Sequence, residues 1–387
     1  MNGVFAVYKP SGISSAKCIG ELQEIFTKSK TFALDLKAMK DKVLYDLSRD
    51  KKWKNRAQKK ADSTKIKIGH GGTLDPMASG VLVVGVGLGT KKLQYYLSEC
   101  QKTYETKALL GISTTTGDAE GEIITKTNVD HITPELVKQT VKKFVGDIKQ
   151  TPPIFSALKV NGKPLYEYAR QGLPLPKEIK VREVRINDIK VIDDDLLSTD
   201  HEFTKLKSEL DENGVPKEHG LMNNPTLNDS PLYYSKEYLE SSEGDLGDVR
   251  PKLLGDDQHQ PEKLPLIHFV SDVSSGTYIR SLISDIGRAM ESAAYMVELI
   301  RVKQSEWQLE KNVFRMEDFD KSEDIWGPIL KKVLDQGGEN VDLATEFAAL
   351  DRQVETTGKG EIESKEESND DDDAPRGEKR TIDKVEK

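Results

Sequence analysis

Hydrophobic positions near the start of the chain favour a strand and then follow a helix period. Residues 4–9 are rich in strand-forming side chains, and a Pro-Ser-Gly turn at 10–12 ends this segment. The next apolar residues recur at spacings of three and four, which predicts a helix capped by Ser14 or Ser15. Its core-facing stripe comprises Ile19, Leu22 and Phe26.

The same patterns predict the elements that follow. An amphipathic helix with lysines on its far side is expected around the stripe Leu36, Met39, Val43 and Leu47. Thr133 followed by Pro134 is a typical helix start, and the apolar face of this helix comprises Leu136, Val137, Val141, Phe144 and Val145. Strands are expected over 104–110, 181–192 and 267–271, and a further helix follows the turn at 274–276, with Leu282, Ile286 and Ala289 toward the core.

Changes in composition indicate the domain organisation. Residues 49–60 are mostly polar, so we expect them to stay disordered until they bind a partner. Residues 193–263 are acidic and polar and read as a surface insertion. We therefore expect one folded α/β domain over 1–330, interrupted by inserts near 27–67 and 193–263, and then a helix and an acidic tail over 331–387.

Several classes of protein are disfavoured by the sequence. The two cysteines, Cys18 and Cys100, show no metal-ligand spacing, which argues against a disulfide framework or a zinc site and for a reducing compartment. The longest apolar run, near 81–89, is too short to span a bilayer. Lys9-Pro10 interrupts the N-terminus before a secretory signal could form.

Positive charge is concentrated in one segment of an acidic chain. Residues 27–67 hold 14 Lys and Arg against five Asp, a net of +9 in a chain whose total is −9, so the remainder carries −18. Such a segment is suited to contact a polyanion. A solvated helical arm with no partner would explain the charge equally well.

The segment richest in candidate chemistry is residues 69–80, Gly-His-Gly-Gly-Thr-Leu-Asp-Pro-Met-Ala-Ser-Gly. Glycines beside His70 allow close backbone approach or backbone angles that side chains forbid. Asp75 is the first candidate for a reactive carboxylate, although Asp followed by Pro is also a typical helix start. His70 could equally be an ordinary loop or core histidine.

Two further features, the glycines at 84–90 and Arg280, each allow two interpretations. Residues 84–90 contain glycines spaced by two, which does not match a dinucleotide fingerprint, so close packing of a strand and a helix explains them better. Arg280 lies at the start of the helix predicted after the turn at 274–276, where the helix dipole disfavours a cation. A surface arginine is one reading, and a buried anion opposite it, such as Asp75, is the other.

Taken in order, the motifs resemble those of the TruB family of tRNA pseudouridine synthases. The resemblance covers roughly residues 3–26, 66–192 and 264–320. Its blocks are KPSGISS at 9–15, the glycine-rich segment at 69–80, KTY at 102–104, QTPP at 150–153 with SALK at 156–159, LYEYARQG at 165–172, SGTYIR at 275–280, and Leu299 with Arg301.

The family resemblance implies a fold and a set of site residues. The fold is the α+β pseudouridine synthase fold, with a mixed, mostly antiparallel sheet flanked by helices. Asp75 would be the catalytic aspartate, Tyr104 the active-site tyrosine, and Arg280 the partner that keeps Asp75 ionised and oriented. Substrate contacts are expected from His70, Tyr278, Leu299, Lys9, Lys159 and Arg301. The reaction that the resemblance implies is the isomerisation of uridine to pseudouridine in tRNA. It would need neither a metal nor an organic cofactor, because no atom enters or leaves the nucleotide.

The two inserts resemble those of the fungal, guide-independent branch of the family. This likeness implies uridine 55 in the T arm of tRNA as the target, with a T-loop-like hairpin in mRNA as a further candidate, and a monomer that uses neither a guide RNA nor a membrane. The branch also suggests the nucleus and mitochondrion as compartments, with the cytoplasm as an alternative. Residues 51–60 could serve as a nuclear signal.

Two rival functions differ in class. One is an RNA-binding or RNA-folding protein with an idle synthase site, against which Asp75, Tyr104 and Arg280 all argue because they are intact. The other is a nucleotide-dependent enzyme that uses the glycines at 84–90. The wrong glycine spacing and the missing phosphate-loop lysine argue against it.

Overall fold

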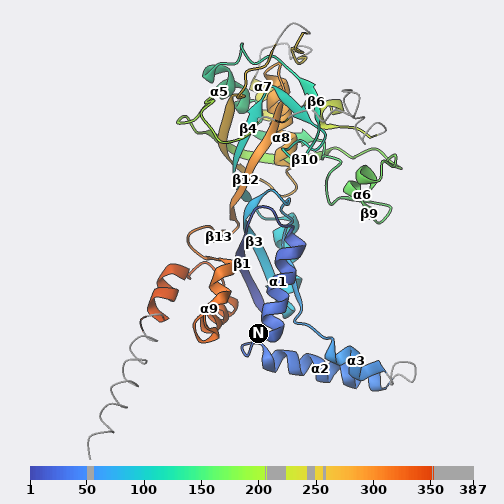
Figure 1. The fold of residues 1–387 in the computed structure, drawn as a ribbon, viewed down its shortest axis with the longest axis vertical. Helices are drawn as coiled ribbons and strands as arrows, with labels where there is room; N and C mark the ends of the chain where they lie inside the picture. The colour runs from blue at the N-terminus through green and yellow to red at the C-terminus, as the bar shows by residue number, and fades with distance from the viewer. Residues whose placement is uncertain are drawn as a thin grey trace, which may run out of the picture.

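The computed structural model describes residues 1–49, 56–204, 206, 224–241, 249–255, 259–350 and 352. Within these residues a mixed sheet of ten strands runs through the length of the molecule (Figure 1). Its main path is β14 (Val313–Phe314), β1 (Gly3–Lys9), β3 (Ser79–Val86), β12 (Ala294–Gln304), β4 (Lys102–Leu110), β11 (Leu266–Val273), β10 (Arg182–Val191) and β7 (Gly146–Gln150). Off this path, β2 (Ile68–His70) pairs with β3 and β13 (Trp307–Gln308) pairs with β12.

Most neighbouring strands are antiparallel, and the parallel pairs are β1 with β14 and β12 with β3. Two hairpins stand apart from the large sheet: β5 (Ile112–Thr114) with β6 (Ile123–Lys126), and β8 (Lys159–Val160) with β9 (Lys163–Pro164). The mixed, mostly antiparallel sheet expected from the family resemblance is confirmed.

Helices flank this sheet along its length (Figure 1). The labelled α-helices are α1 (Ser15–Lys28), α2 (Ala33–Ser48), α3 (Ala57–Asp62), α4 (Leu93–Ser98), α5 (Pro134–Lys142), α6 (Leu165–Arg170), α7 (Lys236–Ser241), α8 (Ile279–Ala289) and α9 (Glu323–Gln336), and residues 343–350 are helical as well. The labelled 3-10 turns in the described part of the chain are η2 (Gly87–Lys92), η3 (Leu227–Asp229) and η4 (Met316–Asp320). Among the described residues, no helix is both long and apolar enough to cross a membrane.

Two large apolar clusters occupy the two ends of the sheet. The first packs α1 and α9 against β1 and β3, with Phe5, Phe26 and Trp326 at its centre. The second packs α5 and α8 against β4, β10 and β11, and Leu282 and Ile286 are fully buried in it. Because β3 and β12 run between these clusters, residues at their ends lie where the two halves meet.

The predicted strands and helices are confirmed with small shifts of their ends. Ser14 caps α1 and Thr133 caps α5 as expected, but α5 ends at Lys142, so Phe144 and Val145 pack from beyond the helix. The glycines near 84–90 allow close packing, since a Cβ on Gly89 would lie 1.8 Å from the carbonyl oxygen of Gly3.

The polar part of the basic segment differs from the expectation. Residues 57–62 form α3 rather than disordered chain, because Ala57 and Ala61 are buried in its packing against α2. Residues 50–55, including Lys51, Lys52 and Lys54, lie outside the described residues, as does the acidic tail beyond 352.

The acidic insertion is described only in part, and some of it is ordered against the body. The Glu237 carboxylate of α7 accepts a hydrogen bond from the backbone N–H of Asp147 at 2.8 Å, at the edge of β7. Asp195 bonds His268 of β11 through Nδ1 at 2.9 Å. The insertion therefore contacts the sheet through Asp195, near the start of the insertion, and through Glu237, in its later part.

Candidate active site

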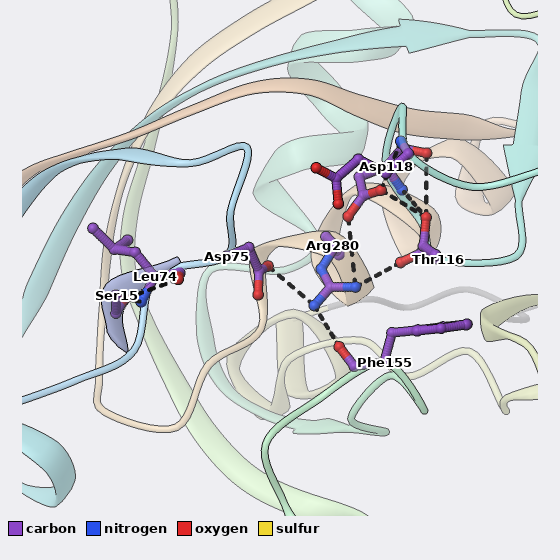
Figure 2. A network of polar contacts seen from close by, with 8 residues as sticks. Ser15, Leu74, Asp75, Thr116, Asp118, Phe155 and Arg280 are labelled. Atoms are coloured by element: carbon purple, nitrogen blue, oxygen red, sulfur yellow. Dashed lines mark hydrogen bonds and ion pairs between the residues drawn. The ribbon is translucent and has the colours of Figure 1, made fainter. Parts of the chain in front are cut away.

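Asp75 lies in the loop between β2 and β3 and does not start a helix. The loop is fixed from both sides of this residue. Ser15 Oγ at the start of α1 accepts a hydrogen bond from the Leu74 N–H at 2.9 Å and donates to the Leu74 carbonyl at 3.0 Å (Figure 2). On the other side, the Pro76 carbonyl accepts from the Gly12 N–H at 2.9 Å. The Ser-rich N-terminal motif thus holds the aspartate loop in place.

Lys9 strengthens this attachment and is not available to a phosphate. Its side chain is fully buried, and its Nζ donates to the carbonyl oxygens of Ile13 at 2.7 Å, Pro10 at 2.9 Å and Pro76 at 3.2 Å. Burial lowers the pKa of Lys9 from 10.5 to about 8. The expectation that Lys9 contacts substrate is wrong, because three carbonyl groups of its own chain already occupy the ammonium group.

Arg280 provides the charge that faces Asp75. Its Nη2 lies 3.0 Å from Asp75 Oδ2, and the arginine is only 4% exposed (Figure 2). Nη2 also donates to the Phe155 carbonyl at 2.7 Å, and Nη1 donates to the Thr116 carbonyl at 2.8 Å. A guanidinium held by two backbone carbonyls has little freedom, so it fixes the direction from which it meets the carboxylate.

Asp118 is a second carboxylate beside the same guanidinium. Its Oδ2 lies 3.6 Å from Arg280 Nη1, and its Oδ1 accepts from Thr116 Oγ1 at 2.6 Å and from the Glu120 N–H at 3.0 Å. Asp118 is 3% exposed. Burial, followed by the neighbouring charges of Asp118 and Asp75, raises the pKa of Glu120. The arginine therefore lies between one buried and one accessible aspartate.

The start of α8 is held by a glutamine that sequence reasoning did not assign. Gln150 Nε2 donates to the Tyr278 carbonyl at 3.0 Å, and the Tyr278 N–H donates to Gln150 Oε1 at 2.8 Å. This pair of bonds fixes the residue that caps the helix two positions before Arg280. The Tyr278 side chain is half-buried, and burial raises its pKa.

Tyr104 and Leu299 belong to the apolar cluster that also contains residues of the aspartate loop. Both are buried, at 7% and 6% exposure, in the cluster that also contains Leu74 and Ala78 from the aspartate loop. They come from the neighbouring strands β4 and β12. The structure thus brings the expected tyrosine and hydrophobic floor residue to the loop that carries Asp75.

The glycines beside His70 have the two uses that the sequence suggested. A Cβ on Gly71 would lie 2.6 Å from Tyr96 Cβ, and Gly72 has a φ of +140°. His70 itself ends β2, and its Nδ1 is buried without a hydrogen-bond partner among the described residues. Burial and then the charge of Arg301 lower the pKa of His70.

Arg301 supports the glycine loop from beneath instead of facing solvent. It is 1% exposed, and it donates through Nε to the Val81 carbonyl at 2.7 Å and through Nη2 to the Gly72 carbonyl at 3.1 Å. The expectation of a direct substrate contact is wrong for Arg301, because its donors face the backbone of the motif. Lys159 is exposed on β8, and its substrate contact stays a prediction.

Sequence reasoning missed Asp118, Gln150, Thr116 and Phe155. Gln150 stands in a motif that the family resemblance included, but nothing local indicated that its amide would bond the start of α8. Asp118 lies in a Gly-Asp-Ala-Glu-Gly segment whose acid between glycines resembles the setting of Asp75. That likeness was the available signal. Among the described residues, no group of three or more His, Cys, Asp or Glu could hold a metal ion.

Comparison with known proteins finds relatives that cover most of the chain. The chain is 45% identical to tRNA pseudouridine synthase 4 of Saccharomyces cerevisiae over 92% of its own length and 90% of that protein. It is 38% identical to tRNA pseudouridine synthase 4 of Schizosaccharomyces pombe, covering 82% of each chain. Tertiary similarity to a Cbf5-Nop10-Gar1 complex is weaker, with a TM-score of 0.42 and 18% identity over 89% of this chain and 58% of that one.

The family model described as "TruB family pseudouridylate synthase (N terminal domain)" matches residues 54–208, a range that contains Asp75, Tyr104 and Asp118. The two yeast relatives extend the match over most of the remaining chain. The chain therefore belongs to the TruB family of pseudouridylate synthases.

Proposed function

We propose that this enzyme isomerises a uridine of tRNA to pseudouridine and that Asp75 is the carboxylate that acts on the nucleotide. The observation that carries the proposal is the 3.0 Å ion pair between Arg280 and Asp75 within the family's motif. The Asp75 side chain is 35% exposed, and its Oδ1 has no hydrogen-bond partner among the described residues. One oxygen is thus oriented by the arginine while the other is free to meet a substrate.

The reaction is an internal exchange of bonds. The bond from N1 of uracil to C1′ of the ribose breaks, C5 bonds to C1′ in its place, and the proton lost from C5 is balanced by the one gained at N1. A carboxylate can divide this change into easier steps by forming a covalent intermediate. Attack on the ribose, attack on the base and removal of a proton are the roles open to Asp75.

The target base must leave its stack to reach Asp75, at a cost of a few kcal/mol. The apolar cluster that includes Tyr104 and Leu299 is suited to receive the uracil ring. Tyr104 would stack on the base and take part in proton transfer. His70 and Tyr278 would contact the rearranged RNA, and Lys159 would contact a phosphate.

The finer assignment is uridine 55 in the T loop, recognised without a guide RNA by a monomer. The inserts near 27–67 and 193–263 support it through their likeness to the fungal branch, as does the similarity to the two yeast enzymes named tRNA pseudouridine synthase 4. A T-loop-like hairpin in mRNA would be a second substrate. The same likeness supports the nucleus and mitochondrion as the proposed compartments, with the cytoplasm as the alternative.

Mapping of the product on defined tRNA tests this proposal. Purified protein is incubated with an unmodified tRNA transcript and with the same transcript carrying cytidine at position 55, and pseudouridine is mapped along both. We expect pseudouridine at position 55 of the first transcript and none in the second. Binding of tRNA without any product would favour the RNA-folding protein with an idle site, and product at other uridines would contradict the assignment to position 55.

A further inference from the structure

Helices α2 and α3 form a helical arm that projects from the body at the far end of α1 (Figure 1). The base of this arm is firmly fixed. Phe32 is fully buried and stacks on Phe26 of α1, with ring centroids 4.7 Å apart. Glu323 of α9 accepts hydrogen bonds from the backbone N–H groups of Lys30 at 2.7 Å and Thr31 at 3.1 Å. The arm therefore has a defined direction relative to the catalytic body.

Most of the arm's surface faces solvent. No residue of α2 is fully buried, and its stripe of Leu36, Met39 and Val43 is only half-buried. On the remaining surface of α2, Leu34 is 82% exposed and Tyr45 is 62% exposed. A projecting helix with so little buried surface gains little free energy from packing. A contribution to the stability of the fold therefore does not account for α2.

The exposed side chains of the arm carry positive charge that nothing in the described structure neutralises. The described residues of 28–67 include 11 Lys and Arg against four Asp, in a chain with a net charge of −9. Among the described Lys and Arg residues of this range, only Lys28 and Lys65, at its ends, make ion pairs with described residues, and both pair with Glu24. Within residues 33–62, which cover the two helices of the arm, the exposed cations without an ion pair to a described residue are Lys37, Lys42, Arg49, Arg56, Lys59 and Lys60.

The arm is a helix length away from Asp75. Ser15, which begins α1, bonds the Leu74 residue next to Asp75, and the arm starts beyond Lys28 at the other end of that helix. At 1.5 Å per residue, the 14 residues of α1 span about 21 Å and the 16 residues of α2 span about 24 Å, and α2 runs sideways from the end of α1 (Figure 1). Only an RNA that reaches tens of ångströms from the target uridine can touch both places.

We propose that the helical arm binds the sugar–phosphate backbone of folded tRNA outside the hairpin that carries the target uridine. This inference rests on the proposed function, since it takes tRNA as the substrate. Phosphate contacts supply affinity and register and do not read base identity. The arm makes whole tRNA a better ligand than its isolated T arm, while the chemistry at Asp75 stays the same.

The test compares two variants on two RNAs. The arm variant carries Lys37→Gln, Lys42→Gln, Lys59→Gln and Lys60→Gln. The control variant makes the same change of charge at exposed lysines elsewhere, by Lys126→Gln, Lys142→Gln, Lys311→Gln and Lys331→Gln. Affinity for an unmodified tRNA transcript and for its isolated T-arm stem-loop is measured between 50 and 200 mM salt. Circular dichroism shows whether each variant is folded.

Each phosphate contact in a duplex contributes about 0.9 to the slope of log affinity against log salt, so losing two contacts should flatten the slope for whole tRNA by roughly 2. We expect the arm variant to bind whole tRNA at least tenfold more weakly at 50 mM salt and to bind the stem-loop as the wild type does. The control variant should keep the wild-type slope. Pseudouridine formation at saturating tRNA should be unchanged in the arm variant.

Three results would overturn the inference. An unchanged salt slope for whole tRNA would mean that the arm is solvated or binds a protein such as an import receptor. Equal weakening on the stem-loop would mean that the arm contacts the target hairpin itself. An equal loss of affinity for whole tRNA in the control variant would mean that the net charge of the protein, and not the position of the lysines, sets the affinity. If wild-type protein binds tRNA through the arm but forms no pseudouridine, the proposed function fails while the arm contact stands.

Discussion

Arg280 meets Asp75 through one terminal nitrogen, at 3.0 Å, while its other terminal nitrogen faces Asp118 at 3.6 Å. The two aspartates differ in access, because Asp118 is 3% exposed and the Asp75 side chain is 35% exposed. One guanidinium therefore connects a buried anion that fixes it to an accessible anion that it orients.

Replacement of Arg280 by lysine should abolish most activity even though the charge is kept. A lysine has no planar fork with which to hold the Thr116 carbonyl, the Phe155 carbonyl and Asp75 together. We expect kcat to fall about 100-fold, the loss that a misplacement of about 1 Å can cause. Arg315→Lys, at an exposed arginine, is the control. Near-wild-type turnover by Arg280→Lys would show that the ion pair is not needed.

Asp118 should act as a positioning residue for Arg280. Asp118→Asn keeps the shape but removes the buried negative charge beside the guanidinium, so Arg280 should shift relative to Asp75. The expected result is a fall in kcat of roughly tenfold to 100-fold with an unchanged KM for tRNA. Asp188→Asn, at an exposed site on β10, is the matched control. A rise in KM with normal kcat would instead place Asp118 in RNA binding.

Lys9 should behave as an anchor of the aspartate loop. Lys9→Met fills similar space but loses the bonds to Ile13, Pro10 and Pro76, so we expect lower stability and lower kcat. Because Lys9 does not contact phosphate, the salt slope of tRNA binding should stay as in the wild type. A flatter salt slope for Lys9→Met would mean that Lys9 does contact a phosphate, against what its burial indicates.

The same lysine gives a pH dependence of stability with a defined sign. Burial lowers the pKa of Lys9 to about 8, against 10.5 in the unfolded chain. Between these values the unfolded chain binds more protons, so the free energy of unfolding should rise with pH from about 8 to 10.5 relative to Lys9→Met. Denaturant titrations of both proteins across that range measure the difference. A difference that is constant or falls with pH would contradict the assignment.

Exhaustive chelation should leave activity unchanged. The isomerisation adds and removes no atom, and the aspartate and arginine supply the charges at the site. The assay uses EDTA under conditions in which the tRNA stays folded, as a melting curve of the RNA alone confirms. Loss of activity that added zinc or magnesium restores, with the RNA still folded, would mean that a metal takes part.

The sequence predicted the pair at the centre of the site but not its surroundings. The position of Arg280 at a helix start allowed either a surface arginine or an anion opposite it, and the family resemblance selected Asp75 as that anion. The roles of Lys9 and Arg301 were predicted wrongly, because their carbonyl partners come together only when the chain folds. No periodicity or spacing in the sequence indicates that the ammonium group of a lysine will donate hydrogen bonds to three backbone carbonyl groups.

Asp118 and Gln150 were missed for a related reason. Each acts through α8, whose residues are far away in the sequence, so neither stands in a pattern of its own. The helix α3 was missed because its stabilising contact is with α2 rather than with a core. Periodic elements that pack on the sheet were predicted well, because the spacing of their own apolar residues indicates which face is buried.

The most direct test of the account is turnover by Asp75→Asn. The amide keeps the shape of the side chain and can still accept a bond from Arg280, but it has no ionised oxygen to offer the substrate. Single-turnover pseudouridine formation on a saturating excess of enzyme, together with tRNA affinity, separates chemistry from binding. The account predicts no detectable product and an affinity within a few fold of the wild type. Product formed at a substantial fraction of the wild-type rate would contradict it.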